Sequence, residues 1–241
     1  MDSDLINNVS YSRGKTSTTY YSQEQTNGAA PFSKVKSPVY IVGDRGEFRR
    51  DSGMAIYTGN ARAWQDDNFV RADRLTIYTN EKKMNGDGHV QSAIYNARRR
   101  GDSTTIPVFA SADSMSYSDP NRTLHYEGDV DIRQGTDRLT GGIADVYLLR
   151  DTSEVEKTIA QRNVVMTQPN RKGTGDWIQY TTADEVAILK GNPARVEDLE
   201  KGSTEGGRLT VNMRDGRVIA DDARGPQSAG RVRSTHKVKK Q

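Results

Sequence analysis

The stretch Tyr126-Glu127-Gly128-Asp129-Val130-Asp131-Ile132 (YEGDVDI) combines a Gly, a small polar residue and then apolar residues that alternate with Asp. A related stretch, YTGNARA, stands at 57–63. Gly and Asp favour positions where the backbone bends, and residues two apart lie on the same face of a β-strand. We therefore interpret Gly128 and Asp129 as a turn that enters a strand. Val130 and Ile132 would then lie on its inner face, with Asp131 facing water.

A second motif precedes this bend at a regular distance. It starts with a small residue, usually followed by Asp. In most repeats larger residues stand three and five positions after the small residue. It begins at Gly43, Ala72, Ala112, Gly141, Gly175 and Gly206. In four of five repeats the residue after the bend follows the small residue by 18 positions. In three of these four repeats that residue is Ala61, Val90 or Val130, and in the repeat that begins at Gly175 it is Pro193. Units of about 30 residues with this pattern build a continuous core only by stacking.

Irregularities in the repeats indicate loops and domain limits. We expect surface loops around Arg98–Arg100 and Arg150–Glu154, where extra residues separate the motifs. Asn8-Val9 resembles His89-Val90, which suggests that the chain begins inside a repeat. The expected organisation is a partial N-terminal repeat and loop at 1–36, stacked β repeats at 37–223, and a basic, flexible tail at 224–241. The tail holds six Lys or Arg and no acidic residue.

Composition agrees with an elongated all-β protein that has a thin core. Leu, Ile, Val and Phe make up 43 of 241 residues, yet the net charge is only +3. Disordered chains combine low hydrophobicity with high net charge, and this chain has only the low hydrophobicity. The absence of Cys leaves cytoplasm and periplasm equally open. No apolar run is long enough to span a bilayer, and Met1–Asp4 does not resemble a signal peptide.

The motifs that resemble catalytic or ligand-binding sites do not match the full patterns of those sites. Gly14-Lys15-Thr16 ends like a phosphate-binding loop, but the required earlier Gly is replaced by Val9. The three His residues have no metal-ligand spacing, and no Cys supports them. Adjacent carboxylates such as Asp66-Asp67 would point to opposite faces of a strand. We therefore predict no catalytic residue, no metal and no cofactor, and hence no enzyme. The basic tail lacks interleaved aromatics, so we expect no nucleic-acid partner.

Several stretches together resemble the OstA-like family, the LptA family of periplasmic lipopolysaccharide-transport proteins. They are Val70–Tyr78 (VRADRLTIY), Gly86–Val90 (GDGHV), Tyr126–Val130 (YEGDV), Asp137–Gly141 (DRLTG) and Leu189–Pro193 (LKGNP). The resemblance implies an elongated, twisted, incompletely closed β-jellyroll whose hydrophobic groove holds lipid acyl chains. It also implies a periplasmic location, with the signal or anchor absent from this chain. Open sheet edges would pair with other OstA-like domains of the transport machinery, or with copies of the chain in a head-to-tail homo-oligomer.

The expected groove is lined by the inward residues of the repeats. These candidate lipid-binding residues are Leu75, Ile77, Val90, Met115, Val130, Ile132, Val146, Val164, Met166, Ile178, Ile188, Leu209 and Val211. The expected function is non-enzymatic binding and transport of lipopolysaccharide or a related lipid across the periplasm.

Three alternatives remain at this point. The first is a structural or adhesive β-repeat protein with a dry core and no lipid ligand. The second is the anchored or outer-membrane partner that shares the same domain. The third is a β-helix enzyme acting on polysaccharide, which would need charged residues stacked at equivalent inward positions. The repeats show no such column.

Overall fold

Every regular element in the described part of the chain is a β-strand, as the sequence predicted. The computed structural model describes residues 2–4, 8–21, 32, 37–95, 106–149, 154–221 and 233–236. The strands are β1 (Asp2–Asp4), β2 (Val9–Tyr20), β3 (Val39–Arg49), β4 (Met54–Gln65), β5 (Asn68–Tyr78), β6 (Lys83–Ile94), β7 (Val108–Ser118), β8 (Thr123–Gln134), β9 (Asp137–Leu148), β10 (Val155–Gln168), β11 (Arg171–Thr181), β12 (Val186–Asp198), β13 (Gly202–Asn212), β14 (Val218–Asp221) and β15 (Arg233–His236).

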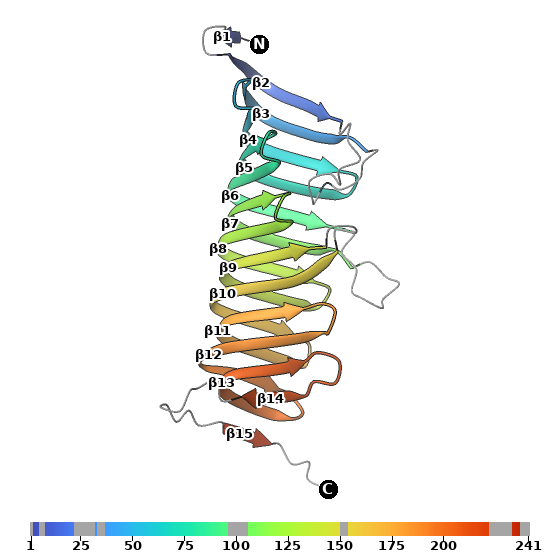
Figure 1. Cartoon of the computed structure of the whole chain (residues 1–241), viewed down its shortest axis with the longest axis vertical. Helices are drawn as coiled ribbons and strands as arrows, with labels where there is room; N and C mark the ends of the chain where they lie inside the picture. Colours follow the sequence, from blue (N-terminus) through green and yellow to red (C-terminus); the bar gives the residue numbers. More distant parts are fainter. Residues whose placement is uncertain are drawn as a thin grey trace.

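The strands form one elongated antiparallel sheet in which each strand pairs with the next along the chain (Figure 1). From β1 to β14 the spatial order is the sequence order, and β15 pairs with β13. Within the described ranges the first strands do not pair with the last ones, so the sheet stays open. Because nearly all pairing is between sequence neighbours, each repeat can add two strands without changing the rest.

The Gly-Asp motif is a bulge inside a long strand rather than a turn that enters one. In β8, Glu127 pairs with Ile143 and Val130 pairs with Gly141, which leaves Gly128 and Asp129 opposite a single residue of β9. Both have positive φ, 83° and 43°. Our interpretation as a turn was wrong because left-handed Gly-Asp pairs serve turns and bulges alike, and only the pairing distinguishes them. Asn85–Gly88 likewise lies within a long strand, β6.

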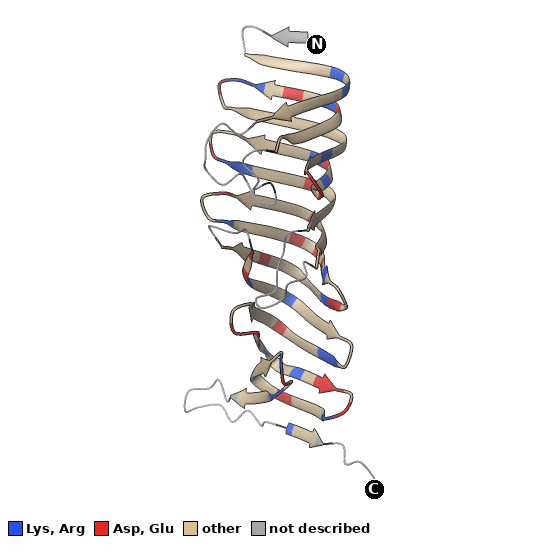
Figure 2. Ribbon diagram, turned by 90° about the vertical axis from the view of Figure 1, so that its right-hand side faces the viewer, with Lys and Arg blue, Asp and Glu red and all other residues tan. Residues whose placement is uncertain are grey.

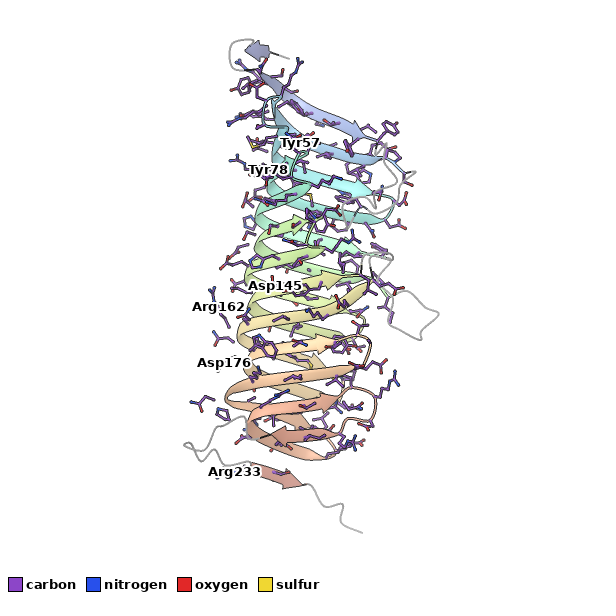
Figure 3. All side chains as sticks on the ribbon, in the orientation of Figure 1. Tyr57, Tyr78, Asp145, Arg162, Asp176 and Arg233 are labelled. Carbon is purple, nitrogen blue, oxygen red and sulfur yellow. The ribbon has the colours of Figure 1, made fainter. Side chains whose placement is uncertain are left out.

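The bulges recur at one level of the even-numbered strands. Left-handed pairs are Gly59-Asn60, Gly88-His89, Gly128-Asp129 and Arg162-Asn163. In three of these repeats a carboxylate of the preceding strand fills the space where a side chain on the Gly would begin: Asp44 at Gly59, Asp73 at Gly88 and Asp113 at Gly128. In β10 the bulge carries a large residue, Arg162, and the facing residue of the preceding strand is a glycine, Gly142. A Cβ on Gly142 would lie 2.9 Å from Arg162 Cβ. Arg162 and Asp176 mark this side of the molecule in Figure 3.

At the bulges the sheet folds lengthwise, so that each long strand contributes to two facing layers (Figure 2). Contacts between strands that are not paired support this arrangement. Ser92, which follows the bulge of β6, contacts Tyr126, which precedes the bulge of β8. The core fills the space between the layers, and charged residues of both signs are spread along the length of the sheet (Figure 2).

In two repeats the bulge lies at a different position from the one that the sequence motifs predicted. In the fifth repeat Gly191, Asn192 and Pro193 are unpaired between Lys190 and Ala194, so the buried residue after the bulge is Ala194 and not the exposed Pro193. An extra residue in this bulge explains the shift. Near the N-terminus the bulge of β2 lies at Gly14-Lys15, between Arg13 and Thr16, and not at Asn8-Val9.

The predicted loop at Arg98–Arg100 and most of the predicted insertion, 150–153, lie outside the described residues. Of the segment expected to be a flexible tail, Arg233–His236 forms β15 and pairs with Gly202–Glu205 of β13. In the part of the chain that the structure describes, no helix is long and apolar enough to cross a membrane.

Candidate functional site

The predicted groove residues converge on the space between the two layers. Ten of the thirteen are buried: Leu75, Val90, Met115, Val130, Val146, Val164, Met166, Ile178, Leu209 and Val211. Ile77 and Ile132 are partly buried and pack against the same cluster. The residue three positions after each small residue, from Gly46 to Leu209, is buried in all six repeats. The repeat spacing therefore identified the inner face.

Ile188 is the exception among the thirteen. Its neighbours Ala187 and Leu189 are the buried residues of β12, so Ile188 lies on the opposite, outer face beside Gln179 and Thr210. The assignment of Ile188 to the inner face was wrong. The run Val186–Leu189 is apolar at every position, and such a run does not reveal which alternate residues face inward.

Bulky tyrosines fill much of the interior. Tyr57, Tyr117 and Tyr126 are among the largest fully buried side chains. The Tyr126 hydroxyl lies 2.8 Å from Ser92 Oγ, and burial raises the pKa of Tyr126 to about 12, although the hydrogen bond from Ser92 opposes this shift. The Tyr117 hydroxyl donates to Asp119 Oδ1 at 2.9 Å. In this state the two layers thus pack directly on each other at the level of Ser92 and Tyr126.

Polar side chains line the inner face at one edge of the folded sheet. Gln65 Nε2 donates to Ser37 O at 2.6 Å, Gln134 Nε2 to Ile106 O at 3.3 Å, and Gln168 Nε2 to Asp137 Oδ2 at 3.2 Å. Each Gln is the last residue of its strand. This polar edge was not predicted, although each Gln follows the residue after the bulge by four positions and the repeats therefore carried the signal.

The same polar edge continues to an ion pair. Arg171 donates to Asp198 Oδ2 at 3.3 Å, and both side chains are nearly buried. Burial raises the pKa of Asp198, but hydrogen bonds from the backbone of Lys201 and Glu200 and from Arg171 outweigh it and hold the pKa below its usual value. The opposite edge of the interior is mainly apolar, with Phe48, Ile77, Leu124, Val146 and Val211 at equivalent inward positions. The interior therefore has one polar edge and one mainly apolar edge.

The sequence pattern of the family described as LptA/(LptD N-terminal domain) LPS transport protein matches residues 40–107 and 110–217. These ranges run from β3 to the residue before β14 and include every bulge from β4 to β12. The chain belongs to the LptA/LptD N-terminal domain family.

A comparison with solved protein structures also found matches. Among matching solved structures is LptH from Pseudomonas aeruginosa, the LptA homologous periplasmic component of the conserved lipopolysaccharide transport device. It is 23% identical to this chain, with a TM-score of 0.49, and the match covers 55% of this chain and 96% of LptH. A comparison with curated protein sequences found no significant match.

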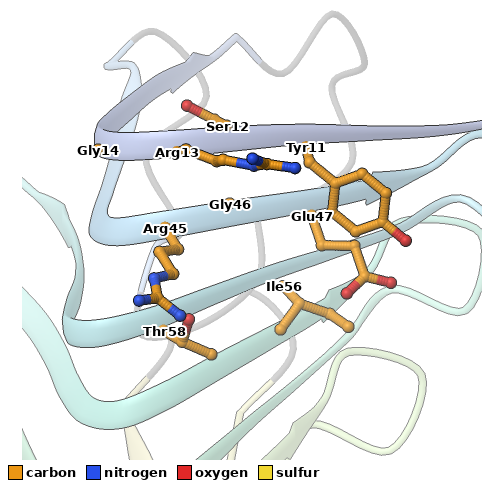
Figure 4. A pocket seen from close by; sticks show the side chains of 9 residues that line it. All are labelled: Tyr11, Ser12, Arg13, Gly14, Arg45, Gly46, Glu47, Ile56 and Thr58. Carbon is orange, nitrogen blue, oxygen red and sulfur yellow. The ribbon is translucent and has the colours of Figure 1, made fainter. Parts of the chain in front are cut away.

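A cavity of about 640 Å³ lies near the N-terminal end of this LptA/LptD-family domain, between residues of β2, β3 and β4 (Figure 4). It is lined by Tyr11, Ser12, Arg13, Gly14, Arg45, Gly46, Glu47, Ile56 and Thr58. None of the thirteen predicted groove residues belongs to this set. The cavity does include Gly46, which is at a buried inward position, and Glu47 within it already pairs with Arg49 at 2.6 Å.

The histidines of this LptA/LptD-family chain that can be described lie outside the interior. His89 is exposed in the bulge of β6, where Nδ1 lies 2.8 Å from Asp73 Oδ2. The hydrogen bond and the charge of Asp73 raise the pKa of His89. His125 Nδ1 lies 2.7 Å from Asp145 Oδ1 on the outer face. Among the described residues no group of three or more His, Asp or Glu is placed to hold a metal ion.

Proposed function

We propose that this protein carries lipopolysaccharide, or a lipid closely related to it, across the periplasm without catalysing a reaction. The observation that carries the proposal is the inner face itself. Inward apolar residues follow one another through the strands from β3 to β13, ten steps of about 4.8 Å, so the apolar lining extends over about 48 Å. An apolar slot of this kind suits acyl chains, because burying each CH₂ contributes about 0.8 kcal/mol.

The two edges of the interior suit the two ends of such a lipid. Acyl chains would point towards the mainly apolar edge near Ile77, and polar head groups would lie at the edge of Gln65, Gln134 and Arg171. Because the layers already pack against each other at Ser92 and Tyr126, lipid must separate them locally. Ile77 and Ile132 are only partly buried, so separation of the layers there requires less loss of packing than at the fully buried inward residues.

The family membership supports lipopolysaccharide as the cargo, and the open edges support partners of the same fold. β2 is uncovered over Thr16–Tyr20 among the described residues, since β1 pairs only with Val9–Tyr11. Unpaired N–H and C=O groups on such an edge are templates for strand addition. We propose that other domains of this family, or further copies of the chain, extend the sheet there.

Native mass spectrometry tests the proposed cargo. The purified chain is mixed with lipopolysaccharide, and in parallel with the same saccharide from which the acyl chains have been removed. We expect a lipid adduct only with the acylated form. Equal binding of both forms would indicate a saccharide-binding surface. Binding of neither would favour a structural repeat protein with a dry core, the alternative that the Ser92–Tyr126 contact supports.

A further inference from the structure

Aromatic side chains form a row across the outer face of β3 to β7. The register places Tyr40 opposite Trp64, Trp64 opposite Phe69, Phe69 opposite Ala93, and Ala93 opposite Phe109. These four steps between strands make a row about 19 Å long. The residues belong to separate strands, and the pairing brings them together on the face opposite the core.

The two ends of the row are exposed, Trp64 and Phe69 between them are partly buried, and Ala93 is buried. Tyr40 is 38% exposed and Phe109 43% exposed. The Tyr40 and Trp64 rings stack with centroids 5.4 Å apart, and Tyr95, itself 37% exposed, meets Phe109 edge-on at 6.0 Å. Clustered exposed aromatics of this kind mark interaction sites, whereas isolated ones do not.

Arginines without acidic partners flank the aromatic row. The neighbouring row on the same face consists of Val42, Arg62, Arg71, Gln91 and Ser111. The guanidinium carbon of Arg62 lies 5.2 Å from the ring centroid of Trp64 and 5.3 Å from that of Phe69. Arg71 donates to the Gln91 side chain. Within the described ranges no carboxylate forms an ion pair with Arg62 or Arg71, so both cations remain available.

The same two rows change character towards the C-terminus. On β10 to β13 they contain Val165, Thr174, Arg195 and Glu205 in one row, and Thr167, Lys172, Glu197 and Ser203 in the other. There are no aromatics among these residues, and Arg195 is neutralised by Glu197 at 2.5 Å and Glu205 at 3.0 Å. On β8 and β9, between the two ends, the rows contain Arg133 and Arg138, and both form ion pairs with Asp131. Among the described residues, the aromatic rings with arginines that have no ion pair therefore lie on β3 to β7 and not on β10 to β13.

We propose that this surface of Tyr40, Trp64, Phe69, Phe109, Arg62 and Arg71 docks onto an anionic phospholipid bilayer. Trp and Tyr rings with one apolar and one polar end favour the interface between membrane and water. Unpaired Arg side chains beside them match the negative charge of the head groups. Docking here would orient the N-terminal end of the sheet at a membrane. It needs no lipid in the interior, so it stands or fails independently of the proposed transport function.

Tryptophan fluorescence tests the contact directly, because the chain has only two Trp residues. The variant Trp177→Phe leaves Trp64 as the sole reporter, and Trp64→Phe leaves Trp177. Trp177 is a matched control, since it too is partly buried and has a cation over its ring, Lys190 Nζ at 4.5 Å. With vesicles of phosphatidylcholine and phosphatidylglycerol we expect a blue shift and quenching by brominated acyl chains for Trp64 alone.

Charge variants complete the test. Each Arg at an anionic surface contributes about a fivefold gain in partitioning, so Arg62→Gln with Arg71→Gln should weaken vesicle binding by roughly 25-fold. The control pair Lys172→Gln with Arg195→Gln removes the same charge from the other end and should leave binding nearly unchanged. Equal loss in both pairs, or no response of Trp64 when the protein binds vesicles, would overturn the proposal. Failure to bind phosphatidylglycerol vesicles at all would overturn it in favour of a soluble acidic partner.

Discussion

Ser92 Oγ and the Tyr126 hydroxyl lie 2.8 Å apart between the two layers of the folded sheet. The residues belong to β6 and β8, which do not pair with each other, and they are only 3% and 2% exposed. Each hydroxyl therefore has its partner on the facing layer. The contact holds the layers together at the centre of the region in which we propose that lipid binds.

Replacing Tyr126 by Phe should destabilise the protein by about 1–2 kcal/mol, because it leaves the buried Ser92 hydroxyl without this partner. The double variant Ser92→Ala with Tyr126→Phe should recover part of the loss, since it removes both polar groups. Urea denaturation of the two single variants and the double variant measures the coupling. Strictly additive losses would show that the two hydroxyls do not interact.

The raised pKa of Tyr126 predicts a fall in stability at alkaline pH. Below pH 10 the hydroxyl is protonated in both the folded and the unfolded chain. Between 10 and about 12 the unfolded chain loses the proton while the folded one retains it, so stability should decline by about 1.4 kcal/mol per pH unit at most. Denaturation at a series of pH values should show a shallower decline for Tyr126→Phe. An unchanged slope in that variant would mean that other groups cause the decline.

At the bulges of β4, β6, β8 and β10 a glycine faces a larger side chain on the neighbouring strand, and Gly128 allows the need for this pairing to be tested. Gly128→Ala should cost about 1–3 kcal/mol, because φ is positive and the new Cβ meets the Asp113 carboxylate. Adding Asp113→Gly should recover the steric part, since it reproduces the arrangement of Arg162 and Gly142. Thermal denaturation measures both. The control Gly135→Ala has positive φ but its nearest neighbour at 3.6 Å, and should show the backbone cost alone.

The fold was predictable because the sequence repeats it. The spacing of 18 residues gave the inner face, and Leu75, Met115 and Leu209 are buried as expected. The bulge at Gly128 was misread as a turn, because both structures use left-handed Gly and Asp. Ile188 was misplaced because its strand is apolar on both faces at that point.

Other features depend on pairing between distant residues. The contact of Ser92 with Tyr126 requires the two layers to face each other, and the sequence pattern is the same for a flat sheet. The row of Tyr40, Trp64, Phe69 and Phe109 depends on the register of five strands. The bulges and the loops decide that register, and their lengths differ between repeats. Periodicity within one strand does not reveal either feature.

Removal of residues 222–241 should promote end-to-end association. β15 covers Gly202–Glu205 of β13, and deleting it leaves the backbone groups of that edge to pair with the uncovered edge of β2 in another copy. Sedimentation velocity at increasing concentration should show larger species for the truncated chain. A shorter truncation, 237–241, keeps β15 and should behave like the full chain. If both truncations remain equally monomeric, β15 does not limit assembly.

The most direct test of lipid binding between the layers is photo-crosslinking at two adjacent residues of β8. Ile132 is partly buried on the inner face, and Arg133 is exposed on the outer face. A photoreactive amino acid is placed at one or the other, and the chain is irradiated in the presence of lipopolysaccharide. We predict a lipopolysaccharide adduct at position 132 and little or none at 133. Equal labelling at both positions, or labelling at 133 alone, would contradict the account.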